Sequence, residues 1–151
     1  MSGNNSNHPN RKLISLKEQI GVCSATHQEE ISSERIAAFC RAVGFPVSSV
    51  SPPTFLTVFR RGEFELLQKL GLNLSNALHA DQHYEYIEPI RAGDRIQFET
   101  HVSQVLEKNS PKQNMQFLTL ETPIQKVTDQ GIILVAKAVS TLVFREVLER
   151  P

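Results

Sequence analysis

Hydrophobic residues recur every three to four positions in the N-terminal half of the chain, which is the spacing of amphipathic helices. The first such stretch begins at Ser32 or Ser33, either of which can cap a helix, and ends before Gly44 and Pro46. The buried face expected for this helix consists of Ile36, Phe39, Cys40 and Val43.

A second helical stretch follows an irregular connection over residues 45–53. Thr54 can cap a helix that runs to about Leu70, and Gly71 stands where such a helix ends. Its wide apolar stripe predicts a largely buried helix. The stripe consists of Phe55, Leu56, Phe59, Gly62, Phe64, Leu66, Leu67 and Leu70. Since a glycine inside a helix costs about 1 kcal/mol relative to alanine, we expect another backbone to approach Gly62 closely.

The period changes to two after Gly71, as in β-strands. Residues 78–87 alternate between an apolar face (Leu78, Ala80, Gln82, Tyr84, Tyr86) and a polar face that includes His79, Asp81 and His83. Further strands are predicted over about 95–107, 115–127 and 132–146, and a short one over 22–27. One buried helix followed by long antiparallel strands favours an α+β fold in which the sheet wraps around the helix.

Composition narrows the class of protein. The chain has 151 residues, 40% of them apolar, which predicts one domain over 13–151 after a polar, disordered tail over 1–12. Sixteen basic and sixteen acidic residues give no net charge, which argues against a nucleic-acid partner. A membrane span needs about 20 apolar residues in a row, and no such run occurs. With no secretory signal and two cysteines, we expect a cytoplasmic protein.

The sequence predicts no metal site or cofactor. On a strand, His79 and His83 lie about 13 Å apart and cannot share a metal ion. No glycine-rich phosphate loop or nucleophile elbow occurs, and Cys40 falls on the apolar face of its helix. The polar face with His79, Asp81 and His83 has two open interpretations: a solvated surface, or part of a ligand site at a subunit interface.

Residues 78–98, LHADQHYEYIEPIRAGDRIQF, resemble the LHxEQxxxYxxPlrxGDxl segment of the MaoC-like acyl dehydratases. SPPTFLTVF is similar to the start of that family's central helix, and GIILVAKAVSTLVFRE to its last strand. The resemblance covers about residues 16–147. It implies the hot-dog fold, a long central helix wrapped by a five-stranded antiparallel sheet.

The resemblance also implies chemistry on acyl thioesters, the hydration of 2-enoyl thioesters to (3R)-3-hydroxyacyl thioesters. The family's catalytic Asp and His lie in a Gly-Asp-x-Asn-Pro-x-His motif after the first helix, where one activates water and the other handles a proton. In this chain Phe45 follows Gly44, and neither Asp nor His occurs between His27 and His79. The catalytic residues are therefore unknown.

These features predict an acyl-thioester-binding subunit that holds the acyl chain for a catalytic hot-dog partner. The two-subunit mycobacterial (3R)-hydroxyacyl-ACP dehydratases resemble this case. Acyl-CoA or acyl carrier protein would bring the substrate, and the assembly would be a homodimer or a heterodimer. The substrate-binding residues that we expect are Pro53, Thr54, Phe55, Phe59, His79 and Asp81.

Two other classes of function remain open. One is a self-sufficient enzyme, either a hydratase with rearranged residues or a hot-dog thioesterase. A thioesterase needs a carboxylate to activate water, and Glu63, Glu65 and Asp81 are the candidates. The other class is a non-enzymatic, acyl-binding or regulatory hot-dog.

Overall fold

The computed structural model describes residues 15–147, so the tail expected over 1–12 lies outside the described residues. Within these described residues the chain forms two α-helices, α1 (Ser33–Val43) and α2 (Arg61–Lys69). Between residues 15 and 147 they are accompanied by three short 3-10 helices: η1 (Lys17–Gln19), η2 (Phe55–Val58) and η3 (Leu74–Asn76). The strands are β1 (His27–Glu30), β2 (Ala77–Tyr86), β3 (Arg95–Phe98), β4 (His101–Asn109), β5 (Gln113–Thr128) and β6 (Gly131–Val147).

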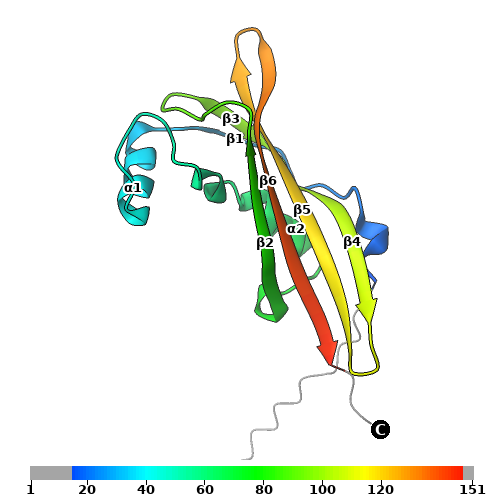
Figure 1. Ribbon diagram of the computed structural model, residues 1–151. Coiled ribbons are helices and arrows are strands. Elements are labelled where there is room, and N and C mark those ends of the chain that lie inside the picture. The colour runs from blue at the N-terminus through cyan, green and yellow to red at the C-terminus, as the bar shows by residue number, and fades with distance from the viewer. Residues whose placement is uncertain (1–14, 148–151) are drawn as a thin grey trace, which may run out of the picture.

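One antiparallel sheet forms the body of the molecule, in the order β1-β3-β5-β6-β2 (Figure 1). β5 is long enough that β3 and β4 pair with different parts of it, while β6 pairs along nearly all of its length. In the part of the chain that the structure describes, the sheet has six strands, not the five expected, in part because the strand predicted over 95–107 is divided between β3 and β4. At this division the backbone of Thr100 bonds to Ser24 of the N-terminal segment: Ser24 N donates to Thr100 O, and Thr100 N to Ser24 Oγ.

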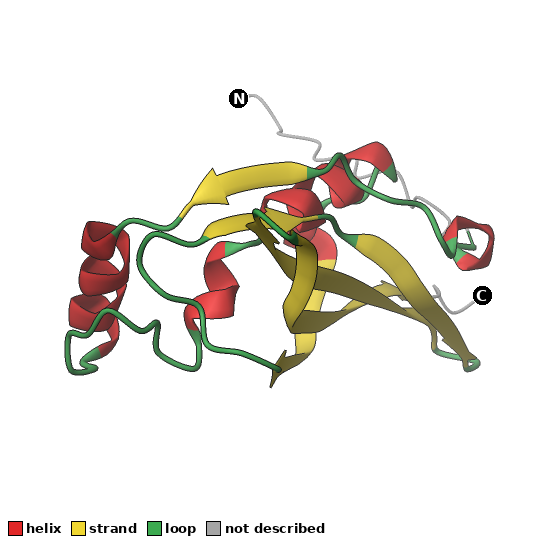
Figure 2. Cartoon of the chain, turned by 90° about the horizontal axis from the view of Figure 1, so that it is seen from above, coloured by secondary structure: helices red, strands yellow, loops and turns green. Residues whose placement is uncertain are grey.

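The predicted central helix is shorter than expected. The backbone leaves helical geometry at Phe59, which separates η2 from α2. Phe59 lies between the rings of Phe55 and Phe98, with ring centroids 5.9 and 5.2 Å away. The break thus lets Phe59 fill the core while Gly62 and Leu66 still face the sheet. Figure 2 shows α1 at one end of the molecule, apart from the helical segment beside the sheet.

The burial of most predicted core residues is confirmed, including Phe55, Phe59 and Leu66. Val43 and Phe64 are exposed, contrary to expectation. Val43 is the last residue of the peripheral helix α1, and the ring of Phe64 carries the Arg60 guanidinium at 5.1 Å. The predicted cap of α1 is present, since the Ser32 hydroxyl accepts from the N–H of Arg35.

A polar layer divides the hydrophobic core in two. One cluster surrounds Phe55 and Phe59, and the other surrounds Leu66 and Leu67. Each element that crosses from one cluster to the other places a polar side chain between them. We call this set the polar layer: Glu63 of α2, Gln82 of β2, Thr100 between β3 and β4, Thr122 of β5 and Ser140 of β6.

Gly62 lies beside the polar layer. A larger residue would not fit at this position, because neighbouring side chains already occupy the space that its Cβ atom would need. A Cβ atom built on it would lie 2.7 Å from both Ser24 Oγ and Thr100 Oγ1. The predicted close approach is therefore present, but side chains make it and not another backbone.

Candidate functional site

A bulge in β2 changes which face each of its side chains occupies. The pairing with β6 slips between His79 and Asp81, so that His79 lies opposite Leu142 and Asp81 opposite Thr141. Because one extra residue reverses the alternation, His79 shares the inner face with Gln82, whose Oε1 lies 3.2 Å from His79 Nε2. The prediction that His79 shares a face with Asp81 and His83 is wrong.

The same bulge explains two errors on the predicted apolar face of β2. Leu78 is 53% exposed, and Ala80, at the bulge itself, is also exposed. Tyr84 and Tyr86 lie beyond the bulge and pack against the first cluster, as expected.

The six predicted substrate-binding residues do not form one site within the chain. Phe55 and Phe59 are buried, whereas Pro53 and Thr54 are exposed. Tyr86 Oη donates to Pro53 O at 2.8 Å, which places the end of β2 beside Pro53.

Asp81 lies five residues before Tyr86, about 17 Å along the strand. His79 is farther still. Only a second subunit could bring either residue beside Pro53 and Thr54, so their shared groove at an interface stays a prediction.

A cleft opens instead between the central helical segment and the sheet. The space in it that a water-sized group can occupy is about 10 Å³, enough for about one water molecule or one ligand oxygen. It is lined by Leu56, Thr57, Phe59, Arg60, Glu63, Gln82, Thr122, Ala138 and Ser140. Four of these residues belong to the polar layer, so the cleft leads to the polar part of the core.

An ion pair forms one wall of the cleft. Glu63 is only 5% exposed, and its two carboxylate oxygens accept from Arg60 Nη2 at 2.7 Å and Arg60 Nε at 3.3 Å. The hydrogen bond to Glu63 raises the pKa of Arg60. Because each charge is held by the other, this wall presents no net charge.

Uncharged polar groups complete the lining. Gln82 Nε2 donates to Val139 O at 3.1 Å, which fixes the amide together with its contact to His79. Ser140 is 3% exposed, and within the described part of the chain its hydroxyl has no hydrogen-bond partner. Burial raises the pKa of Tyr84, which lies near this wall.

Sequence reasoning did not single out Arg60, Gln82 or Ser140. One signal was present, since Gln82 is the one polar residue on the expected apolar face of its strand. Arg60 and Glu63 have the three-residue spacing of a helical pair. Nothing comparable distinguishes Ser140.

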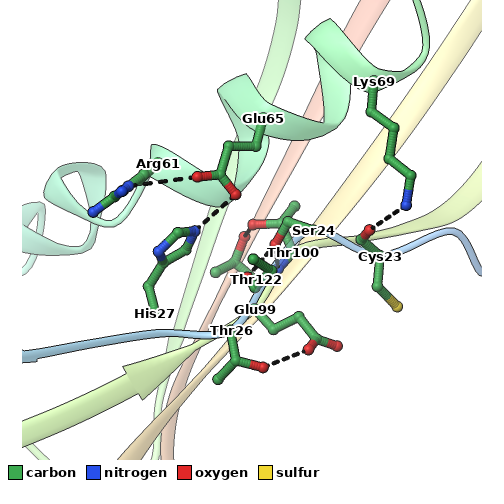
Figure 3. A network of polar contacts seen from close by, with 11 residues as sticks. Cys23, Ser24, Thr26, His27, Arg61, Glu65, Lys69, Glu99, Thr100 and Thr122 are labelled. Carbon is green, nitrogen blue, oxygen red and sulfur yellow. Dashed lines mark hydrogen bonds and ion pairs between the residues drawn. The ribbon is translucent and has the colours of Figure 1, made fainter.

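A second polar network joins α2 to the N-terminal segment (Figure 3). His27 Nε2 lies 2.9 Å from Glu65 Oε2, and Arg61 Nε lies 3.5 Å from Glu65 Oε1. The hydrogen bond from His27 lowers the pKa of Glu65. Lys69 Nζ donates to Cys23 O at 3.3 Å. These contacts attach the N-terminal segment to the helix.

Neither cysteine is a nucleophile candidate in this environment. Burial is the main cause that raises the pKa of the Cys23 thiol, and Cys40 is fully buried. A thiol with a raised pKa is less often the reactive thiolate.

Gly93 and Asp94 form a structural turn, as predicted. Gly93 has a φ of 90°, which suits glycine. The carboxylate of Asp94 accepts from the N–H of Arg91 at 2.8 Å and pairs with Lys126 at 2.7 Å. This Asp therefore holds the turn between β2 and β3.

The connection after α1 is held by backbone hydrogen bonds to the segment before β3. Ser51 N donates to Ile90 O, and Ala92 N donates to Ser49 O, both at 2.9 Å. Residues 44–53 contain no Asp, Glu or His. The segment thus offers hydroxyls and backbone groups, but no side chain suited to general acid–base chemistry.

Comparison with solved structures defines the class of fold. The chain is similar to the HadBC (3R-hydroxyacyl-ACP dehydratase) complex from Mycobacterium tuberculosis, with a TM-score of 0.68 and 19% identity over 83% of this chain and 96% of that one. It is also similar to the ChsH1–ChsH2 complex from the same organism (TM-score 0.62, 14% identity, 90% of each chain). Together with the antiparallel sheet and its helices, these similarities confirm the hot-dog fold.

The family follows from the sequence comparisons. The model of the FAS1-like dehydratase domain region matches residues 47–135. A UPF0336 protein of Saccharopolyspora erythraea is 31% identical over 114 residues, which are 74% of this chain and 68% of that protein. One from Streptomyces griseus is 34% identical over 88 residues, 56% of this chain and 53% of that protein. The chain belongs to the FAS1-like dehydratase domain family, which confirms the MaoC-like resemblance.

None of the helices in the described part of the chain is long and apolar enough to cross a membrane.

Proposed function

We propose that this chain is the acyl-thioester-binding subunit of a dehydratase-type hot-dog enzyme, and that a second hot-dog subunit supplies the catalytic Asp and His. The observation that carries the proposal is the composition of residues 44–53, where the family's catalytic motif would lie and where no acid or histidine occurs. Family membership supports the reaction class. The two structural neighbours described as complexes support a second subunit.

The reaction divides naturally between two such subunits. Adding water across the C2–C3 double bond of an enoyl thioester requires one group to activate water and another to handle the proton at C2. The partner would provide both, and this chain would hold the acyl group across the mouth of the cleft beside Arg60, Gln82 and Ser140. Acyl-CoA or acyl carrier protein would deliver the thioester.

The open edge of β2 is the place where we expect the partner to bind. β2 pairs with β6 along one edge, while the sheet order ends at its other edge. A ten-residue edge strand offers unpaired N–H and C=O groups to another strand. A groove between the subunits would then contain His79 or Asp81 of one chain and Pro53 or Thr54 of the other.

A coupled hydratase assay on crotonyl-CoA tests the proposal. The chain alone should show no appreciable turnover, because losing one acid–base group typically costs a factor of 10² to 10⁴. Adding a hot-dog protein encoded beside it that carries the Asp and His motif should restore turnover. The matched control is the same partner with its motif Asp changed to Asn. Robust turnover by the isolated chain would overturn the proposal.

A thioesterase is the second candidate, because Glu63 places a buried carboxylate in the cleft. Both of its oxygens already accept hydrogen bonds from Arg60, so activating water would require that ion pair to open. The same assay mixture, monitored for free thiol, separates the two functions. Thiol release that Glu63→Gln abolishes would favour the thioesterase.

A further inference from the structure

We infer that the cleft recognises a neutral oxygen-bearing group, a hydroxyl or a keto group, within the acyl chain of the substrate. This oxygen is distinct from the one that hydration places on C3. The inference rests on the proposed function, which makes the cleft an acyl-binding site. It names the substrate class as oxygenated acyl thioesters, as opposed to plain hydrocarbon chains.

The position of the cleft within the core is the first argument. A site for a plain hydrocarbon would be expected within one of the two hydrophobic clusters, whose members are buried apolar side chains of the chain itself. The cleft lies at the polar layer between them and is lined by Glu63, Gln82, Thr122 and Ser140. A methyl or methylene group placed here would displace water from the Ser140 hydroxyl and from the Arg60 guanidinium without giving either a new partner, which is unfavourable.

Unused hydrogen-bonding capacity is the second argument. Ser140 is almost fully buried and its main chain lies in the sheet, but its hydroxyl, in a residue that lines the cleft, has no hydrogen-bond partner within residues 15–147. A serine hydroxyl can both donate and accept, so it suits a hydroxyl or a carbonyl oxygen equally. Arg60 bonds to Glu63 through Nε and Nη2, which leaves Nη1 as a further donor.

The charges of the lining exclude ionised groups. A ligand carboxylate would be attracted by Arg60 but would meet the carboxylate of Glu63 beside it. An ammonium group would meet Arg60 in the same way. Because the pair is mutually neutralised and Glu63 is buried, a charged ligand group would lose its hydration without gaining a free counter-ion. A neutral oxygen has no such penalty.

Binding measurements with acyl-CoAs of one length test the inference. The full-length chain, alone and with its catalytic partner, is titrated with octanoyl-CoA, with hydroxyoctanoyl-CoAs bearing the hydroxyl at successive carbons beyond C4, and with the ω-carboxylate analogue. At least one hydroxyl position should bind about three- to tenfold more tightly than octanoyl-CoA, the effect of one neutral hydrogen bond. The carboxylate should bind no more tightly than octanoyl-CoA.

Two serines provide a matched pair of variants. Ser140→Ala should remove the preference for the hydroxylated chain. Ser103→Ala, at a partly buried serine of β4 that bonds to Thr119 O and does not line the cleft, should retain it. Circular dichroism checks that both variants fold, and the ligand series on the unaltered chain tests the inference without any variant.

The outcomes separate this inference from the proposed function. If octanoyl-CoA and every hydroxylated chain bind equally, or the carboxylate binds best, the oxygen-recognition inference is wrong and acyl binding stands. If no acyl-CoA binds to the chain or to the complex, the proposed function itself fails.

Discussion

The two glutamates of α2 make ion pairs on opposite sides of one helix, and the two sides differ in kind. Glu63 faces the cleft, is 5% exposed and is held through both oxygens by Arg60. Glu65 has a side chain that is 36% exposed and bonds to His27 and Arg61. Residues two apart on a helix do not face each other, so Glu63 and Glu65 contact different parts of the molecule.

The comparison shows that similar ion pairs have different consequences at different depths. On the cleft side, the charge of Glu63 is buried and depends on one partner. On the other side, Glu65 is partly solvated and shares two partners, so its pairs chiefly fasten the N-terminal segment to the helix. The cleft side combines buried polar groups with an open space, and that side carries the proposed binding role.

The largest loss of stability is expected for a variant on the cleft side of α2. Arg60→Ala would leave the carboxylate of Glu63 buried without its partner and should lower the free energy of unfolding by about 3 kcal/mol. Arg61→Ala, the matched change at an exposed arginine of the same helix, should cost much less. Urea denaturation of the two variants measures the difference directly.

A double variant sharpens this test. Replacing both partners of a buried ion pair by apolar residues is often nearly neutral, so Arg60→Met combined with Glu63→Leu should recover most of the lost stability. If Arg60→Ala and Arg61→Ala lower the free energy of unfolding equally, the ion pair on the cleft side of α2 is no more buried in its effect than the pair of Glu65.

Gly62 lies between the two sides of α2. Adding a side chain at this position should lower the stability by an intermediate amount. Alanine favours a helix by about 1 kcal/mol over glycine, but its Cβ would lie 2.7 Å from both Ser24 Oγ and Thr100 Oγ1. We expect Gly62→Ala to cost about 1–3 kcal/mol from overpacking. Gln68→Ala, at an exposed position of α2, should change stability by less than about 0.5 kcal/mol. A stabilised Gly62→Ala variant would contradict the close packing at this point.

The order and type of most elements follow from the sequence because hydrophobic periodicity is a local signal. Ser32 caps α1 as predicted, and the turn residues Gly93 and Asp94 separate β2 from β3. The divided central helix could not be foreseen, since the break at Phe59 places its ring between Phe55 and Phe98, and Phe98 is far away in the sequence. The division at Thr100 likewise depends on Ser24.

The candidate site was less predictable for the same reason. The bulge at Ala80 has no glycine to announce it, yet it moves His79 to the other face of the sheet. The polar layer is assembled from four elements and the connection between β3 and β4, each contributing one side chain, so no single segment displays it. The absence of the catalytic pair after Gly44, by contrast, could be recognised because the family's motif is contiguous.

The smallest expected effect is a change with pH in the stability that Glu65 contributes. The hydrogen bond from His27 lowers the pKa of Glu65 below its ordinary value of 4.5. A carboxyl whose pKa is lower in the folded than in the unfolded state stabilises the fold above its unfolded pKa, and this contribution disappears as the pH falls through the folded pKa. The stability difference between the unaltered chain and Glu65→Gln should therefore be largest above about pH 5 and should shrink steadily in more acidic solution.

His27→Ala provides the background that isolates the cause. The pKa of Glu65 is lowered chiefly by His27, with a smaller contribution from the charge of Arg61. In the His27→Ala background, Glu65→Gln should thus produce a flatter change of unfolding free energy with pH, as measured by urea denaturation at a series of pH values. Equal pH profiles in the two backgrounds would show that the pair at 2.9 Å does not link the N-terminal segment to α2. A steeper loss of stability with falling pH in the unaltered chain would identify His27 as the residue that lowers the pKa of Glu65.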